Sequence, residues 1–461
     1  MTAVLTALAD RLGADCVSID TDDLRAHALD WQTDPFDAVL PIAVLRPRTT
    51  TETSAVLRIC TEHHIPLTVQ GGLTGLSGGA VPTVGSVALS LERMNRILDI
   101  DPIGATMTVE CGATLQKVQE AAAAEGMFFP LDLGARGSCT IGGNIGTNAG
   151  GNRVLRYGMM RELVLGLEVV LADGTVVSSM NRMLKNNSGY DLRGLFIGSE
   201  GTLGVVTRAV LRLFDQPEAR HTALCLVSGF DEAARMLRLT RSRLGATLSA
   251  YELMWPKFFS FACELHGMRP FGPDAEGYGL LIEASGAARD AALFETFMEE
   301  AFNEKLLVDG VIAQSLRDTE SFWKLRDSSG ELRTRFWPNA NFDVSASTGR
   351  LGDMVDELER RAAARWPDVQ IAVFGHIADG NIHIAVKTLL EPFPLREIEQ
   401  TVYGLVGEYN GSISAEHGIG LAKKDYLHHT RSREEVAVMA RIKRALDPQD
   451  SLNPGKIFQN D

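Results

Sequence analysis

The order of apolar and polar positions in the first half of the chain predicts short strands that alternate with helices. AVLPIAVLRP has the apolar, β-branched content of a strand, and TETSAVLRICTEHH follows it with apolar residues at helical spacing. Thr51 or Thr53 is the candidate N-cap of that helix. LVLGLEVVLADGTVVSS is typical of a hairpin that turns at Asp173-Gly174. The pattern predicts an α+β unit with mixed sheets that ends near Pro217.

The second half of the chain has a more regular alternation of strands and amphipathic helices. HTALCLVSGF and YGLLIEASG have the apolar content of buried strands, whereas DEAARMLRLTRSRLG and AALFETFMEEAFNEK have helical spacing. This alternation predicts an antiparallel sheet covered by helices. REEVAVMARIKRALDP then predicts a helix that ends before Pro448. We therefore expect domains over residues 1–216 and 217–415, followed by a C-terminal segment over 416–461.

Composition and charge narrow the possible partners. The 461 residues are 45% hydrophobic and 23% charged, with a formal net charge of −14, which disfavours nucleic acid and anionic membranes. No apolar stretch approaches the roughly 18 residues that a transmembrane helix needs, and no basic segment precedes an apolar run at the start. The six scattered cysteines, without a CxxC pair, indicate reduced thiols. We expect a soluble, cytoplasmic protein that binds no nucleic acid and has no transmembrane segment.

Three glycine-rich segments stand out in the first half: residues 70–79, 134–151 and 198–204. Glycine lets successive backbone N–H groups converge on an anion, because no Cβ blocks the approach. The first segment lacks the Gly-Lys-Ser/Thr ending of a mononucleotide P-loop, and it does not open a helix as a nicotinamide-binding G-x-G-x-x-G motif does. Each segment could instead be a tight turn of a β-rich domain. Three of them, with Ser, Thr and Asn among the glycines, favour anion binding.

These segments resemble the FAD-binding signatures of the vanillyl-alcohol oxidase / p-cresol methylhydroxylase (PCMH) superfamily. The resemblance is carried, in order from about residue 36, by QGGLTGLSGG, PLDLGARGSCTIGGNIGTNAGG, KNNSGYDLRGLFIGSEGTLGVVT and LDPQDSLNPGKIF. Within the superfamily the chain is similar to FAD-dependent D-2-hydroxyacid dehydrogenases, which act on D-lactate, D-2-hydroxyglutarate or glycolate. The resemblance implies an α+β protein with a PCMH-type FAD-binding domain over 1–216. It further implies an antiparallel-sheet substrate (cap) domain over 217–415, with the helical segment 416–461 returning to the flavin.

The resemblance also implies where FAD would lie. The diphosphate would rest on the first glycine segment, the flavin and ribityl chain along the second, and the adenosine against the third, with one tail residue returning to the flavin. The implied binding residues are Gly71, Gly72, Thr74, Gly75, Ser77, Pro130, Gly137, Ser138, Gly142, Gly143, Thr147, Asn148, Gly151, Glu200, Gly201, Gly204, Val205 and Asn453.

The first segment departs from the superfamily pattern at two positions. Gln70 and Leu73 stand where the superfamily usually has Arg and Asn, which leaves the phosphates to backbone N–H groups. Members with covalent flavin commonly carry a His in this segment, and none is present here. We therefore expect FAD to be bound non-covalently.

The stretch FGHIADGNIHI carries the strongest signal for a metal. A two-residue turn at Asp379-Gly380 would place His376 directly opposite His383, with Cβ atoms about 5 Å apart. Two imidazoles placed in this way can hold one ion at about 2.1 Å each. A single strand His is more often a satisfied core residue, but two buried, opposed imidazoles without a metal or carboxylate would leave polar groups unpaired.

The segment SAEHG supplies an acid beside a base, Glu416 and His417. These could be surface residues of an exposed loop. The resemblance implies instead that Glu416 joins His376 and His383 on a divalent ion such as Zn²⁺, and that His417 is the general base. Two His, one carboxylate and an open position form a catalytic rather than a structural set.

A substrate carboxylate needs a cation, and the resemblance implies that Arg326 binds it through two N–H groups. Arg326 could instead lie on a helix surface and pair with Asp327 or Glu331, and Arg333 and Arg335 are alternative cations.

Two further positions bear on the substrate. Relatives that act on D-2-hydroxyglutarate have a Lys and an Asn where this chain has Asn341 and Ala385. These departures favour a compact or apolar D-2-hydroxy acid, such as D-lactate, over a dicarboxylate.

In the expected reaction the metal binds the substrate hydroxyl, His417 takes its proton and the hydride passes to flavin N5. A quinone, a cytochrome or an electron-transfer flavoprotein would then reoxidise the flavin. The alternatives are an FAD oxidase that uses oxygen, a flavin-binding electron-transfer subunit such as a glycolate oxidase component, and a hydrolase that needs only the metal. A homodimer is compatible with each of these functions.

Overall fold

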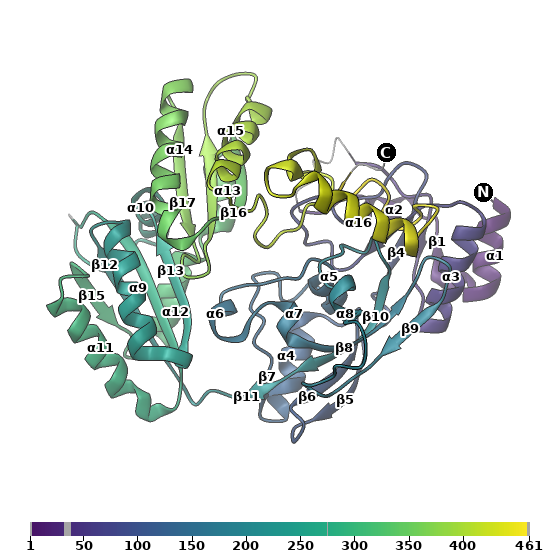
Figure 1. The fold of residues 1–461 in the computed structure, drawn as a ribbon, viewed down its shortest axis with the longest axis horizontal. Coiled ribbons are helices and arrows are strands. Elements are labelled where there is room, and N and C mark those ends of the chain that lie inside the picture. Colours follow the sequence, from purple (N-terminus) through teal and green to yellow (C-terminus); the bar gives the residue numbers. More distant parts are fainter. Residues whose placement is uncertain (1, 32–37, 274, 459–461) are drawn as a thin grey trace. The chain divides into compact units, whose positions relative to one another are not determined.

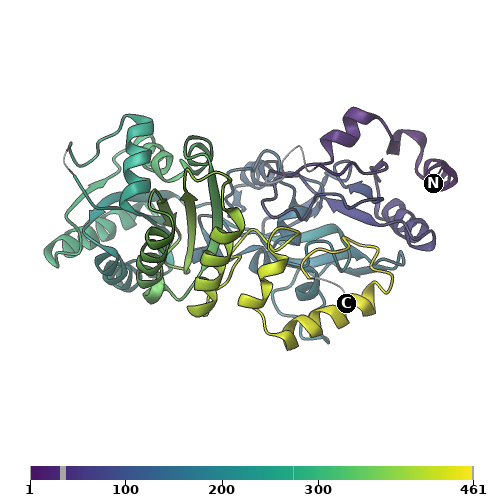
Figure 2. The same cartoon turned by 90° about the horizontal axis from the view of Figure 1, so that it is seen from above.

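The computed structural model describes residues 2–31, 38–273 and 275–458, which divide into two compact units (Figures 1 and 2). The first unit consists of Met1–Gly151, Gly158–Gln216 and Glu416–Asp461. The second consists of Asn152–Tyr157 and Pro217–Ala415. The chain therefore passes between the units directly after Gly151 and directly before Glu416.

The first unit contains mixed and antiparallel sheets, as predicted. Its four-stranded sheet has the order β1-β2-β4-β3, in which β4 runs parallel to both β2 and β3. Its five-stranded sheet, β5-β6-β10-β8-β9, is antiparallel throughout, and β7 pairs with β11. The strands are β1 (Val17–Ser18), β2 (Val44–Leu45), β3 (Leu67–Gln70), β4 (Val87–Ser90), β5 (Ile97–Asp101), β6 (Thr106–Glu110), β7 (Met127–Phe128), β8 (Val164–Val170), β9 (Val176–Ser179), β10 (Val205–Arg212) and β11 (Phe214–Asp215).

The hairpin expected at Asp173-Gly174 is present between β8 and β9. Val170 pairs with Val176, and the Leu171 N–H donates to the Thr175 carbonyl at 2.9 Å. Gly174 has a φ of +84°, a conformation that favours glycine.

The helices of the first unit are mostly short. They are α1 (Thr2–Leu12), α2 (Thr21–Ala26), α3 (Thr50–Glu62), α4 (Leu115–Ala124), α5 (Ile141–Gly146), α7 (Met160–Leu163), α8 (Arg193–Phe196) and α16 (Arg433–Leu446). The prediction that Thr51 or Thr53 caps α3 is wrong. Thr49 is the last extended residue before the helix, and its hydroxyl accepts the Glu52 N–H at 3.1 Å.

The second unit is built on one seven-stranded sheet of order β15-β12-β14-β13-β17-β18-β16, and every neighbouring pair is antiparallel. The antiparallel, helix-covered sheet predicted for this half is thus confirmed. The strands are β12 (Ala219–Val227), β13 (Leu248–Met254), β14 (Tyr278–Gly286), β15 (Asp309–Ile312), β16 (Asn339–Ser345), β17 (Gln370–Gly375) and β18 (Asn381–Lys387).

Helices cover both faces of this sheet (Figure 1). The helices are α6 (Val154–Tyr157), α9 (Phe230–Leu244), α10 (Pro256–His266), α11 (Ala291–Asn303), α12 (Leu316–Arg326), α13 (Ser329–Arg335), α14 (Leu351–Arg365) and α15 (Leu395–Glu408). Helices α10, α12 and α13 share an apolar core with the sheet, to which they contribute Phe258, Leu325 and Leu332. Phe258 stacks on Phe374 of β17, with ring centroids 4.2 Å apart.

No helix in the described part of the chain is long and apolar enough to span a membrane.

We predict that Phe258→Ala lowers the free energy of unfolding of the second unit by about 3–5 kcal/mol, because the ring is fully buried and stacked. Phe302→Ala is the control, since Phe302 is 59% exposed, and it should change the value by less than about 0.5 kcal/mol. Denaturant unfolding of both variants checks this, and equal effects would contradict the packing described here.

Candidate functional site

The first two glycine segments meet backbone to backbone in the first unit. A Cβ on Gly71 would lie 2.7 Å from Thr140 Oγ1 and 3.1 Å from Gly143 Cα, and one on Gly72 would lie 2.0 Å from the Ser138 carbonyl oxygen. Only glycine allows this approach. The two segments therefore form one continuous surface at the end of β3 and the start of α5.

The third glycine segment is joined to this surface and to the C-terminal tail. The Glu200 N–H donates to the Gly146 carbonyl at 2.8 Å. The side-chain amide of Asn453 forms hydrogen bonds within the protein through both of its polar atoms. Oδ1 accepts the Val69 N–H at 2.9 Å, and Nδ2 donates to the Glu200 carbonyl at 2.6 Å. The Glu200 carboxylate is turned toward the tail and accepts the N–H groups of Ile419 and Gly420, each at 2.8 Å. Burial raises the pKa of this carboxyl.

The backbone of the first segment is available to an anion. Among the described residues, no protein acceptor is recorded for the seven successive N–H groups from Gly71 to Ser77. By contrast, the first N–H groups of α5 are satisfied internally, since Ile141 donates to Ala113 and Gly142 to Cys111. A row of unused backbone donors beside close-packed glycines fits the diphosphate of a dinucleotide such as FAD.

Other residues of the predicted FAD set hold the second segment in place. Thr147 Oγ1 donates to the Gly143 carbonyl at 3.2 Å, and Asn148 Oδ1 accepts the Arg161 N–H at 2.9 Å. Gly151 forms a parallel bridge with Asp132. Pro130, Gly137, Gly204 and Val205 also lie in the first unit, where Val205 begins β10.

The predicted acid and base lie where the chain enters the first unit for the last time. Glu416 Oε1 accepts the Gly151 N–H at 3.0 Å, and Ser77 Oγ donates to the His417 carbonyl at 3.1 Å. Glu416 and His417 are thus tied by hydrogen bonds to the second and first glycine segments respectively.

The predicted two-residue turn at Asp379-Gly380 is wrong. Strand β17 ends at Gly375 and β18 begins at Asn381, and the residue opposite His383 is Phe374 rather than His376. His376 instead opens a five-residue loop, which is closed by hydrogen bonds from the Asp379 N–H to the His376 carbonyl and from the Gly380 N–H to the Ile377 carbonyl. Longer-range pairing with β13 and β16 fixes this register, and a turn motif alone does not reveal it.

The two imidazoles nevertheless meet. The His376 and His383 ring centroids are 5.8 Å apart with the rings nearly perpendicular, and their candidate ligand atoms lie within 4.8 Å of each other. The loop carries His376 back over the strand that bears His383. The predicted proximity is therefore correct, although it arises from a loop and not from strand pairing.

Glu252 of β13 fixes the orientation of His376, and the motif analysis did not identify it. Its Oε1 accepts from His376 Nδ1 at 2.6 Å, and its Oε2 accepts from Arg326 Nε at 2.8 Å. Arg326 Nη2 lies 2.9 Å from His376 Nε2. Because a guanidinium only donates, Nε2 must accept and Nδ1 must carry the proton. The ring is therefore neutral, with its lone pair on Nε2, the form that binds metals.

The three side chains are buried together. Glu252, Arg326 and His376 are 1%, 7% and 5% exposed. Burial would raise the pKa of Glu252, but the His376 ring and the Arg326 guanidinium lower it to about 2. Arg326 also contacts Asp327 at 3.3 Å, so the pairing with Asp327 is present, although Arg326 is not on the surface.

Asp343 is a second carboxylate that the motif analysis missed. It lies on β16 directly opposite His383, is 1% exposed, and has a carboxylate oxygen within 4.8 Å of a ring nitrogen of His383. Its carbonyl accepts the N–H of Ala415, the residue before Glu416, at 3.4 Å. In the sequence Asp343 is a single acidic residue after Phe342 in an apolar stretch, and this pattern does not distinguish a ligand from any other strand residue.

Beyond His383 the same face of the sheet is apolar. Phe374, Ala385 and Phe336 belong to its buried cluster, and the Phe374 ring centroid is 5.0 Å from that of His383. Asn341, opposite Ala385, is exposed and bonds to Asn339.

Comparison with known proteins agrees with this geometry. Residues 41–179 match the FAD binding domain family, and residues 216–457 match the family of FAD linked oxidases, C-terminal domain. The D-2-hydroxyglutarate dehydrogenase of Xanthomonas citri pv. viticola is 40% identical over 447 residues, which cover 95% of this chain and 93% of that protein. The D-2-hydroxyglutarate dehydrogenase of Stutzerimonas stutzeri is 37% identical over 454 residues, which cover 96% of each.

Two solved structures share the fold at low sequence identity. Substrate-bound p-cresol methylhydroxylase has a TM-score of 0.79 at 18% identity and covers 100% of this chain and 98% of that one. An alkyldihydroxyacetonephosphate synthase also has a TM-score of 0.79 at 18% identity, and it covers 99% and 86%.

The meeting of three glycine segments in the first unit, together with these matches, defines an FAD-dependent oxidoreductase with the PCMH-type fold. The predicted fold class and FAD-binding domain are thereby confirmed. More particularly, the chain belongs to the D-2-hydroxyglutarate dehydrogenase family.

We predict that Glu252→Ala lowers the free energy of unfolding by about 3–5 kcal/mol, because it leaves the buried Arg326 charge without its carboxylate. Glu408→Ala breaks the more exposed pair with Arg361 and should change the value by no more than about 1 kcal/mol. If both variants unfold at the same denaturant concentration, the buried pair does not have the role described here.

Proposed function

We propose that this protein is an FAD-dependent dehydrogenase that oxidises a D-2-hydroxy acid to the corresponding 2-oxo acid. The observation that carries the proposal is the pair of imidazoles, His376 and His383, the first of them oriented by the buried Glu252, in a chain whose other half has the fold of an FAD-binding domain. The names of the relatives at 37–40% identity support the same reaction class.

His376, His383 and Glu416 would hold a divalent cation such as Zn²⁺. Glu252 accepts from His376 Nδ1, so Nε2 is the nitrogen that would bind the cation, and Glu416 directly follows Ala415, which is bonded to the strand opposite His383. Two His and one carboxylate leave a position open for substrate. A cation at this site would supply Lewis-acid stabilisation of the substrate oxygen.

Arg326 would bind the substrate carboxylate, and the geometry gives it a donor for this purpose. Its Nη2 now points at His376 Nε2, and that nitrogen cannot accept this hydrogen bond and ligate a cation at the same time. Binding of the cation would therefore release a guanidinium N–H, while Nε stays fixed on Glu252. The released donor lies beside the ligand site, where a carboxylate can bridge Arg326 and the metal.

His417 would act as the general base that takes the hydroxyl proton. Ser77 Oγ donates to its carbonyl, so the backbone at His417 is held on the glycine segment that would carry the flavin cofactor. FAD, bound without a covalent link, supplies the hydride acceptor. A quinone, a cytochrome or an electron-transfer flavoprotein would then take the electrons.

The apolar side of the site favours a compact or apolar D-2-hydroxy acid such as D-lactate. Phe374, Ala385 and Phe336 line the sheet beyond His383, and the exposed Asn341 carries no charge. A second carboxylate placed there would lose hydration against the apolar side chains, and the ammonium of Lys387 on the same face of β18 packs 5.4 Å from the centroid of the Phe336 ring. In this respect the chain would differ from the D-2-hydroxyglutarate dehydrogenases that it resembles.

We predict that His383→Ala, or removal of the cation by a chelator, leaves FAD bound but lowers the rate of anaerobic flavin reduction by at least 100-fold. Both treatments deprive the site of its cation and leave the glycine segments intact. His417→Ala is the matched variant and should keep the metal while losing most of the rate. Stopped-flow absorbance of the flavin, with metal analysis, measures both, and an unchanged reduction rate would reject the metal role.

We predict that D-lactate gives a kcat/KM at least tenfold higher than D-2-hydroxyglutarate in a dye-reduction assay, because the sheet beyond His383 is lined mainly by apolar side chains. L-lactate is the stereochemical control and should give no reduction. A preference for the dicarboxylate would overturn the substrate assignment, and peroxide formation at the same rate without dye would identify an oxidase.

A further inference from the structure

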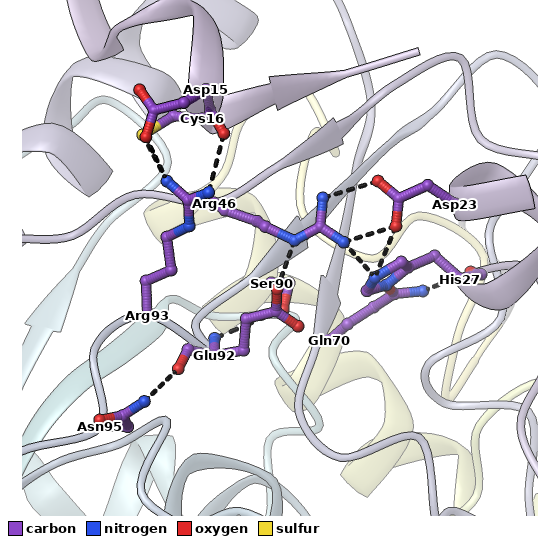
Figure 3. Close-up of polar contacts among 10 residues, drawn as sticks. All are labelled: Asp15, Cys16, Asp23, His27, Arg46, Gln70, Ser90, Glu92, Arg93 and Asn95. Atoms are coloured by element: carbon purple, nitrogen blue, oxygen red, sulfur yellow. Dashed lines mark hydrogen bonds and ion pairs between the residues drawn. The ribbon is translucent and has the colours of Figure 1, made fainter. Parts of the chain in front are cut away.

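A polar network in the first unit connects the N-terminal segment to the first glycine segment (Figure 3). Gln70, the last residue of β3, is 1% exposed, and its carboxamide is fully engaged. Its Oε1 lies 2.7 Å from His27 Nδ1, and its Nε2 donates to the carbonyls of His27 and Ala80, each at 2.8 Å. Gln70 is the first residue of the glycine segment and Ala80 directly follows its last residue. The Gln70 side chain therefore joins the two ends of the segment.

The direction of every hydrogen bond in this network is set by Arg46. Arg46 Nη2 lies 3.0 Å from His27 Nε2, and a guanidinium can only donate. His27 Nε2 therefore accepts, so Nδ1 carries the ring proton and donates to Gln70 Oε1. This in turn requires Gln70 Nε2 to face the two carbonyls. The orientation of the amide follows from the network without ambiguity.

Arg46 itself is anchored by carboxylates. Asp23 of α2 receives two bonds from it, at 2.7 and 2.6 Å, and Glu92 receives a third from Nε. The paired guanidinium lowers the pKa of Asp23 to about 2, so this carboxylate stays charged at neutral pH. Carboxylates from two segments of the first unit thus hold the Arg46 guanidinium next to His27.

The chain after α2 touches the glycine segment at two further points. Asp30 Oδ2 accepts the Gly78 N–H at 2.9 Å, and the Trp31 N–H donates to the Gly75 carbonyl at 3.2 Å. These contacts lie on each side of Ser77. Neither uses an N–H group between Gly71 and Ser77, so the anion-facing donors stay available.

We infer that residues 20–31 are a positioning element for the flavin site, in which Arg46, His27 and Gln70 fix the first glycine segment in its FAD-binding conformation. This segment precedes residues 41–179, the part that matches the FAD binding domain family. Residues 70–79 contain no Lys or Arg, so their affinity for the FAD diphosphate depends on backbone N–H groups that already point the right way before FAD binds. The hydrogen bonds of Arg46, His27 and Gln70 hold the backbone in that conformation. The inference rests on the proposed function only in taking FAD as the ligand.

The test measures FAD affinity and apoprotein stability separately. Gln70→Met keeps the length of the side chain but removes all three bonds, and we expect the Kd for FAD, from flavin fluorescence on titration of apoprotein, to rise at least tenfold. His27→Leu should act in the same way. His27→Asn retains a donor near the position of Nδ1 and should restore affinity to within about threefold of the wild type.

Arg93→Gln is the matched control. Arg93 ties Asp15 in the same N-terminal region, at 2.7 Å, without touching the glycine segment (Figure 3). It should lower the melting temperature of the apoprotein without changing the Kd for FAD. If Gln70→Met and His27→Leu lower the melting temperature but bind FAD as tightly as the wild type, the network is only structural and the inference is wrong. If the wild type itself binds no FAD, the proposed function fails instead.

Discussion

Burial of the Glu252 carboxylate between Arg326 and His376 is the interaction on which the substrate half of the molecule depends. An ionised carboxylate in an apolar core is tolerated only with a cation and with hydrogen bonds to both of its oxygens. The antiparallel order β13-β17-β18-β16 meets this need, since it brings Glu252, the loop after β17 and His383 to one face. The orientation of the imidazole then follows from neutralisation of the charge, because Nδ1 donates to Glu252 and Nε2 is left as the nitrogen that would bind a cation.

The same logic applies to the flavin half in a different form. There the constraint is the close approach of glycine backbones, and within the described part of the chain the N–H groups from Gly71 to Ser77 have no protein acceptor. Side chains fix the backbone at this site: Gln70 donates to the carbonyls of His27 and Ala80, and Asn453 bonds to the Val69 N–H and the Glu200 carbonyl. In both units buried polar side chains orient the groups that would meet a ligand, and they need not touch it themselves.

Sequence patterns were sufficient to predict the helices, the strands and the α+β fold class, because apolar periodicity and glycine content depend on local structure. They failed where long-range pairing decides the result. The loop after β17 is set by β13 and β16, so an Asp-Gly motif gave the wrong register for His376 although the two imidazoles do meet. Glu252 and Asp343 were missed because a single acid in an apolar strand has no local signature. Thr49 was missed as a cap because four threonines lie within five residues, and only the position at which the helix starts distinguishes them.

X-ray absorption at the metal edge of the purified holoprotein measures the ligands of a bound cation. We predict a divalent cation with two imidazole nitrogens at about 2.1 Å and otherwise oxygen ligands, because Glu252 orients His376 close to His383. A spectrum with one imidazole or none, or with sulfur in the coordination shell, would contradict it.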